Sequence, residues 1–119
     1  MLPIILLVED DDTLRMLTSD ALTLLDAQVL ECSGADEALT ILESGILVNL
    51  LFTDIRMPGR LDGLELANLV SMRWPLLPII VTSGNRLSTD ILPSGAAFIP
   101  KPWTLGVLFE TVRPLLGSG

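Results

Sequence analysis

Short apolar runs alternate with segments of helical periodicity along the whole chain. Ile4–Val8 is a continuous apolar run, which is typical of a strand buried on both faces. Further strands are predicted at Gln28–Cys32, Asn49–Thr53, Pro78–Thr82 and Ala96–Ile99. Apolar residues at helical spacing predict helices at Asp12–Leu25, from Ser33 to about Ser44, from Asp62 to about Arg73, and at Trp103–Leu115. Strands that alternate with helices indicate an α/β fold with a parallel sheet and right-handed crossovers.

Several of these helices carry recognisable sequence signals. Ser33-x-x-Asp36 and Asp62-x-x-Glu65 resemble capping boxes, in which two side chains bond to backbone N–H groups at the start of a helix. The first predicted helix presents apolar residues at helical spacing, namely Leu14, Leu17, Ala21 and Leu24. These patterns predict where the helices start and which side of the first helix is apolar.

Polar and charged residues gather where the predicted strands end. Glu9 and Asp10 follow the first strand directly, and Asp54 follows the third. Thr82 ends the fourth strand, and Lys101 comes shortly after the fifth. Because ligands of open parallel sheets lie outside the carboxyl ends of the strands, we expect these side chains to share one site.

The charges of this predicted site favour a divalent cation. Three carboxylates and one ammonium group leave a net charge of −2, and carboxylate oxygens select Mg²⁺ or a similar hard ion. Without a metal, crowded carboxylates should raise one another's pKa. A carboxylate close to Mg²⁺ is also a nucleophile toward phosphorus, and Thr82 and Lys101 would then bind the phosphoryl oxygens.

The acidic run that contains Glu9 and Asp10 continues into the first helix. Asp11 and Asp12 stand where a helix favours an aspartate cap and acids in its first turn. We therefore assign Glu9 and Asp10 to the site, and Asp11 and Asp12 to the start of the helix.

Composition narrows the functions that the chain can have. Its 119 residues are enough for one domain with a single core. Only 7 Lys and Arg are present, they are scattered, and the net charge is −8, which argues against direct binding to nucleic acid. The absence of histidine excludes Ser-His-Asp and Cys-His catalysis and argues against an ordinary zinc site.

The same sequence predicts a cytoplasmic protein with no membrane insertion. The single Cys32 cannot form an internal disulfide, which fits a reducing compartment. The longest uncharged run, Trp74–Asn85, is interrupted by prolines and is too short for a spanning helix of roughly 20 residues. No basic segment precedes the first apolar run, so no signal peptide is predicted.

Taken together, the motifs resemble the receiver domain of bacterial two-component response regulators. The resemblance covers nearly the whole chain and rests on VED, FTDIRMPG, IIVTSG and FIPKP, in this order at the predicted strand ends. It implies a doubly wound, flavodoxin-like fold with five parallel strands in the order 2-1-3-4-5 and helices on both faces. It also implies a receiver domain at residues 1–116, stand-alone or excised from a longer protein, with 117–119 as a native tail or a cloning remnant.

The resemblance assigns roles to the metal-site residues. Asp54 becomes the phosphoacceptor. Asp10 becomes a direct Mg²⁺ ligand, and Glu9 acts on the ion through water. Arg56 contributes its backbone carbonyl to the metal.

The resemblance also assigns roles on the phosphoryl side of the site. Thr82 and Lys101 bind the phosphoryl group. Phe98 falls where the family has an aromatic that changes rotamer on activation, although a purely structural core aromatic is an equal alternative. Pro102 follows a lysine in a pair that the family commonly joins by a cis peptide bond.

Two segments depart from the family pattern. The loop MPGRLDG is one residue longer than the commonest form. Between the fourth and fifth strands, Pro93 and Gly95 limit any helix to roughly Leu87–Leu92, where the family has a full fourth helix. We therefore expect a shortened or irregular fourth helix, and we expect Asn85–Gly95 to change most on activation.

The predicted function is that of a phosphoacceptor rather than an enzyme. A sensor histidine kinase or histidine phosphotransfer protein would donate the phosphoryl group, and an unidentified downstream protein would respond. Pairing of two copies is left open. One alternative is an inert receiver that docks without phosphorylation. The other is a phosphatase of the haloacid dehalogenase type, in which Glu9 stands where the nucleophile should be and only Glu110 follows Lys101 as an acid.

Overall fold

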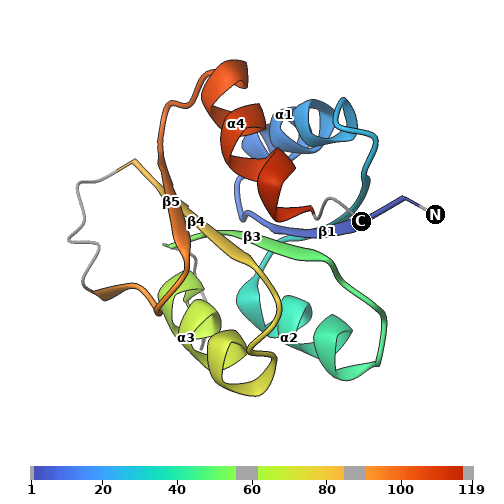
Figure 1. The fold of residues 1–119 in the computed structure, drawn as a ribbon, viewed down its shortest axis with the longest axis vertical. Helices are drawn as coiled ribbons and strands as arrows, with labels where there is room; N and C mark the ends of the chain where they lie inside the picture. Colours follow the sequence, from blue (N-terminus) through green and yellow to red (C-terminus); the bar gives the residue numbers. More distant parts are fainter. Residues whose placement is uncertain (1, 56–61, 85–90, 117–119) are drawn as a thin grey trace.

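The computed structural model describes residues 2–55, 62–84 and 91–116. Its strands are β1 Ile4–Val8, β2 Gln28–Cys32, β3 Leu50–Asp54, β4 Ile79–Ser83 and β5 Ala97–Pro100. Its helices are α1 Asp12–Thr23, α2 Ala35–Glu43, α3 Gly63–Arg73 and α4 Leu105–Leu115. The strands form one parallel sheet in the order β2-β1-β3-β4-β5, which confirms the predicted α/β class and strand order (Figure 1).

Helices cover both faces of the sheet, as predicted. Helices α1 and α4 lie on one side and α2 and α3 on the other (Figure 1). The central strands supply side chains to both faces: Leu6 and Leu51 pack toward α2 and α3, and Leu7 and Phe52 pack toward α1 and α4. All of these side chains are buried. The apolar runs of the central strands β1, β3 and β4 therefore correspond to strands buried on both faces, whereas the outer strands β2 and β5 are partly exposed.

Parallel register brings the ends of four strands to one edge of the sheet. Asp54 is paired in register with Thr82, and Thr82 with Ile99. Beyond the strands, the backbone N–H of Glu9 donates to Cys32 at 3.0 Å, and the N–H of Lys101 donates to the carbonyl of Ser83 at 2.9 Å. The residues that follow β1 and β5 are thus fixed to the neighbouring strands. Strands β3, β4 and β5 begin and end one residue later than predicted, so Asp54 is the last residue of β3.

The apolar face predicted for α1 is only partly correct. Ala21 is buried, but Leu17 is 51% exposed and Leu24 is 66% exposed. The face turned toward the sheet instead includes Thr18 and Ser19, both buried. The buried face of α1 also includes Leu22, so apolar spacing alone indicated the wrong stripe.

Of the three helix starts for which the sequence predicted a capping residue, two are confirmed and one is wrong. Asp11 caps α1 by accepting from the N–H of Leu14 at 2.8 Å. Asp62 caps α3 in a capping box with Glu65. Helix α2, however, starts after Gly34 without a side-chain cap, so the box predicted at Ser33 does not form.

The side chain that reaches the start of α2 comes from one residue beyond the predicted partner. Glu37 accepts from the backbone N–H of Ser33 at 3.1 Å. Asp36 remains in the first turn, where its charge suits the N-terminal end of the helix.

The connection between β4 and β5 is only partly described. Its residues 91–96 contain no α-helix, and Gly95 has a positive φ of 85°. The remainder, 85–90, lies outside the described residues, as does most of the short helix predicted at Leu87–Leu92. The longer loop predicted after Asp54 lies largely in 56–61, also outside the described residues.

The different starts of α2 and α3 lead to a stability prediction. Replacing Asp62 by Ala should lower the free energy of unfolding by about 1 kcal/mol, because the N–H of Glu65 loses its acceptor. Ser33→Ala is the matched control and should have little effect, since the Ser33 side chain caps nothing. Urea denaturation of both variants measures the difference. Equal losses would contradict these cap assignments.

Candidate functional site

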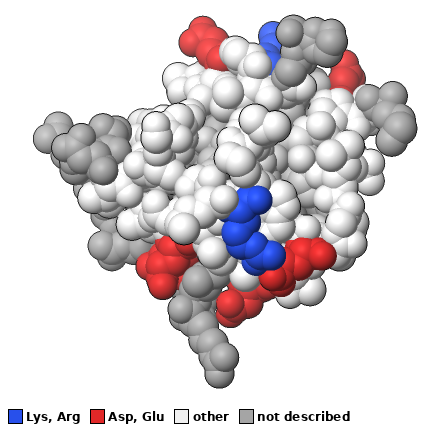
Figure 2. Space-filling view, turned by 60° about the horizontal axis from the view of Figure 1, so that its bottom comes forward, with Lys and Arg blue, Asp and Glu red and all other residues white. Residues whose placement is uncertain are grey.

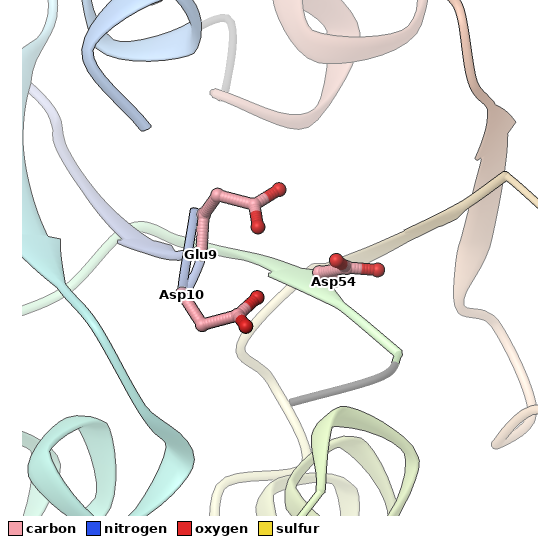
Figure 3. Close-up of side chains that lie close together, drawn as sticks. All are labelled: Glu9, Asp10 and Asp54. Carbon is pink, nitrogen blue, oxygen red and sulfur yellow. The ribbon is translucent and has the colours of Figure 1, made fainter. Parts of the chain in front are cut away.

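Three carboxylates meet at the edge of the sheet where the strands end. Glu9 and Asp10 follow β1, and Asp54 ends β3; one oxygen from each lies within 4.8 Å of the others. Figure 3 shows the side chains of Glu9 and Asp10 extending toward the side on which Asp54 lies. Glu9 and Asp54 are buried, whereas Asp10 is exposed. The structure thus brings together the three acids that the strand-end argument selected.

Lys101, which follows the outer strand β5, forms ion pairs with two of these acids. Its Nζ donates to Oε1 of Glu9 at 2.8 Å and to Oδ2 of Asp54 at 3.0 Å. The lysine side chain is 18% exposed, so both ion pairs are largely shielded from water. One ammonium group therefore holds together the C-terminal ends of β1, β3 and β5.

The environment of this cluster shifts two pKa values. Burial raises the pKa of Glu9, against the hydrogen bonds from Lys101 and from the backbone of Asp11, and the charge of Asp54 raises it further. The repulsion predicted between carboxylates is therefore present at Glu9, but burial is the larger cause. Burial would lower the pKa of Lys101, yet its hydrogen bonds to Glu9 and Asp54 and their charges outweigh this, and its pKa is raised.

Thr82 places a hydroxyl group on the strand next to Asp54. Its Oγ1 is buried and has no hydrogen-bond partner among the described residues. A buried hydroxyl without a partner destabilises a protein by about 1–3 kcal/mol. Thr82 pairs in register with Asp54, and its carbonyl accepts from the N–H of Ile55 at 3.0 Å. The unpaired hydroxyl beside Asp54 suits an additional acceptor bound at that carboxylate.

The donor set fits a hard divalent cation. All the ligand atoms brought together are carboxylate oxygens, and with Lys101 the cluster carries a net charge of −2 from its −3 and +1. No histidine exists in the chain, and burial raises the pKa of the Cys32 thiol to about 12, which removes it as a thiolate ligand. These properties match Mg²⁺ better than zinc or copper.

Gly63 is a site residue that sequence reasoning missed. A Cβ at this position would lie 1.6 Å from the backbone oxygen of Asp54, and the Gly63 N–H donates to the carbonyl of Ile55 at 2.8 Å. Glycine therefore lets the start of α3 approach the end of β3 directly behind Asp54. The available signal was a glycine immediately after the Asp62 cap, where it weakens the helix.

Arg15 is a second residue to which the sequence gave no role. It lies on α1, and its guanidinium donates to the backbone carbonyl of Glu9 at 2.9 Å. The only sequence signal was its place as the first basic residue after the acidic run.

Three further predicted residues lie at the margin of this site or outside the described residues. Phe98 is half-buried and packs against the core between the sheet and helices α2 and α3. This placement agrees with the core alternative and leaves its switch role a prediction. The Lys101–Pro102 peptide bond is cis, as the resemblance implied. Arg56 lies outside the described residues, so the role of its carbonyl stays a prediction.

The distribution of charge offers no extended basic surface on the face shown in Figure 2. There the basic side chains near the centre of the view border acidic ones. Among the described residues, no helix combines the length and the apolar character needed to cross a bilayer.

Known proteins with related sequences and structures point to one family. A sequence model described as "Response regulator receiver domain" matches residues 5–113. The response regulator protein FleR of Pseudomonas aeruginosa is 33% identical over 119 residues, which cover 96% of this chain and 25% of FleR. A chemotaxis protein CheY homologue of Campylobacter jejuni is 32% identical over 122 residues, covering 97% of this chain and 93% of the homologue.

A solved structure gives the same answer for the fold. The response regulator receiver protein from Sinorhizobium medicae superposes with a TM-score of 0.91 at 27% identity, covering 98% of this chain and 96% of that one. The present chain thus spans about a quarter of the length of several curated relatives and nearly all of the CheY homologue.

The raised pKa of Glu9 predicts how this residue affects stability. Because its folded pKa lies above the ordinary value of 4.5, stability from Glu9 is present below that value and is lost as pH rises through the folded pKa. Glu9→Gln should therefore raise the melting temperature at pH 7 in the presence of a chelator, and the gain should vanish near pH 4.

Thermal unfolding at the two pH values measures this effect. The exposed Glu110→Gln is the control and should change the melting temperature little at either pH. A lower melting temperature for Glu9→Gln at pH 7 would mean that its ion pair with Lys101 outweighs its burial.

Proposed function

The chain belongs to the response regulator receiver domain family, and on this premise we propose that Asp54 is its phosphoacceptor. The family consists of receivers in two-component systems and is not a family of classical enzymes. The observation that supports the proposal most is the position of Asp54: a buried carboxylate at the end of β3, within reach of two further acids and bonded to Lys101.

The proposed reaction is a transfer of one phosphoryl group. A carboxylate oxygen of Asp54 forms a bond to phosphorus while the bond from phosphorus to the donor histidine's nitrogen breaks. A carboxylate that attacks phosphorus has no proton to lose, so the reaction needs no general base. Lys101 already holds one oxygen of Asp54 and would bind the phosphoryl oxygens, and the unpaired hydroxyl of Thr82 would donate to one of them.

Mg²⁺ is the proposed cofactor. Asp10 and Asp54 would bind it directly, Glu9 through water, and Arg56 through its backbone carbonyl. When bound, the ion neutralises charge on the phosphoryl group during transfer. In the described part of the chain, the cation that pairs with Glu9 and Asp54 is Lys101.

The proposed partners follow from the same chemistry. A sensor histidine kinase or a histidine phosphotransfer protein supplies the phosphoryl group, and an unidentified downstream protein reads the result. We place the receiver domain at residues 1–116, in the cytoplasm, without direct contact to nucleic acid. It serves either as a stand-alone receiver or as part of a longer protein. The CheY homologue, of which it covers 93%, represents the first arrangement, and FleR, of which it covers 25%, represents the second.

The proposed switch begins at Thr82. Movement of this residue toward a phosphoryl group on Asp54 would carry along the segment that follows β4, and Phe98 on the adjacent β5 would follow. A shift of this kind requires only that the phosphorylated form prefer one arrangement by a few kcal/mol.

Phosphorylation of Asp54 can be measured directly. With Mg²⁺ and acetyl phosphate, the protein should gain one phosphoryl group in intact mass, and Asp54→Asn should gain none, because an amide cannot attack phosphorus. The exposed Asp20→Asn is a control that should be labelled like the parent. A parent protein that stays unlabelled would favour the alternative of a docking module that works without phosphorylation, and a labelled Asp54→Asn would place the acceptor elsewhere.

The metal assignment can be measured by stability. Mg²⁺ at about ten times its Kd should stabilise the folded protein by about 1.4 kcal/mol, because it binds the folded state alone. Asp10→Ala should abolish the shift in melting temperature, whereas Asp36→Ala in the first turn of α2 should keep it. A Mg²⁺ response that survives in Asp10→Ala would show that the ion binds at another place.

A further inference from the structure

We propose that Arg15 is a positioning residue for the metal site, and that it acts by holding the peptide group that joins Glu9 to Asp10. Its Nη1 donates to the carbonyl oxygen of Glu9 at 2.9 Å. The inference rests on the proposed Mg²⁺-dependent function, and it assigns to a residue of α1 a task at the end of β1.

Arg15 is itself held from two other directions. Its Nη2 donates to Oδ1 of Asp12 at 2.6 Å, and its Nε lies 3.7 Å from Oε1 of Glu31 on β2. The side chain is 19% exposed, so it is mostly enclosed between these elements. A guanidinium group is planar and its donors point in fixed directions, which makes it a rigid connection between β1, β2 and the first turn of α1.

The contact with the Glu9 carbonyl bears on Asp10 through the geometry of the peptide bond. The peptide group is planar, so a fixed carbonyl direction also fixes the plane that leads to the next Cα. Glu9 has its own side-chain contacts, with Lys101 and with the N–H of Asp11 at 3.2 Å. In the described part of the chain, the exposed Asp10 carboxylate has no hydrogen bond, so its direction depends on the backbone that Arg15 holds.

The positive charge of Arg15, taken alone, would weaken the binding of Mg²⁺ rather than strengthen it. A positive group near the site repels Mg²⁺, and it also offsets the negative charges of Asp12 and Glu31. If Arg15 acted only through charge, its replacement by a neutral residue would make Mg²⁺ bind more tightly. If it acts by positioning Asp10, the same replacement weakens binding, so the direction of the change distinguishes the two roles.

Two variants separate position from charge. Arg15→Lys keeps the positive charge but replaces the planar fork by a single ammonium group, which cannot hold Glu9 and Asp12 in the same geometry. Arg15→Met keeps much of the apolar stem and removes the charge. Arg73→Met is the matched control, because it removes an arginine that pairs with Glu43 at 2.8 Å on the side of α2 and α3.

The measurement is the Kd of Mg²⁺ from calorimetric titration of the folded proteins at pH 7, together with the melting temperature in a chelator. Arg15→Met should weaken Mg²⁺ binding about tenfold, the lower end of the range for groups that support metal ligands. Arg15→Lys should weaken it by a smaller factor, and Arg73→Met should leave it unchanged. A purely structural role would lower the metal-free melting temperature without changing the Kd.

The opposite results would overturn the inference. Parental or tighter Mg²⁺ binding in both Arg15 variants would show that Arg15 does not position the site. If Arg15→Met does not fold, Arg15→Lys alone decides, since its charge is unchanged and any loss of affinity comes from position. A parent protein that binds no Mg²⁺ at millimolar concentration would overturn this inference and the metal role in the proposed function together. A parent that binds Mg²⁺, with variants that bind it equally well, would overturn this inference alone.

Discussion

The ion pairs of Lys101 with Glu9 and Asp54 hold together the edge of the sheet on which the proposed chemistry depends. They join residues 92 and 47 positions apart in the sequence, at the ends of strands that meet only in the folded protein. Taking such charges out of water is unfavourable, and the attraction offsets this only when the geometry is good. One ammonium group cannot neutralise three carboxylates, so the edge keeps an excess of negative charge that a divalent cation can neutralise.

The rest of the fold offsets the destabilising groups at this edge of the sheet. The raised pKa of Glu9 and the unpaired hydroxyl of Thr82 both destabilise the folded protein. Two apolar layers, one on each face of the sheet, supply the compensating stability, and the central strands contribute to both. Gly63 adds a steric condition: only a residue without Cβ lets α3 start against the backbone of Asp54. The site therefore combines groups that destabilise the folded protein with two apolar layers that stabilise it.

Much of this could be predicted from the sequence, because continuous apolar runs determine both the strands and the places where they end. Once the strands are parallel, Asp54 and Lys101 must come to the same edge. The predictions failed where the pattern of apolar and polar residues does not determine which side chains are buried or which atoms they contact. Leu17 has helical spacing but is exposed, whereas the polar Ser19 lies on the buried face of α1. The contact of Arg15 with the Glu9 carbonyl involves a backbone atom and leaves no trace in residue type.

The acidic run after β1 shows how one stretch serves the fold and the site at once. Three of its four carboxylates have a separate partner: Glu9 has Lys101, Asp11 has the N–H of Leu14, and Asp12 has Arg15. The exception in the described structure is Asp10, the exposed one. The repulsion between these carboxylates is thus offset at each of the three, either by a cationic side chain or by an N–H group at the start of a helix. The one carboxylate left without a partner stands beside Asp54, where a metal ion would complete the set.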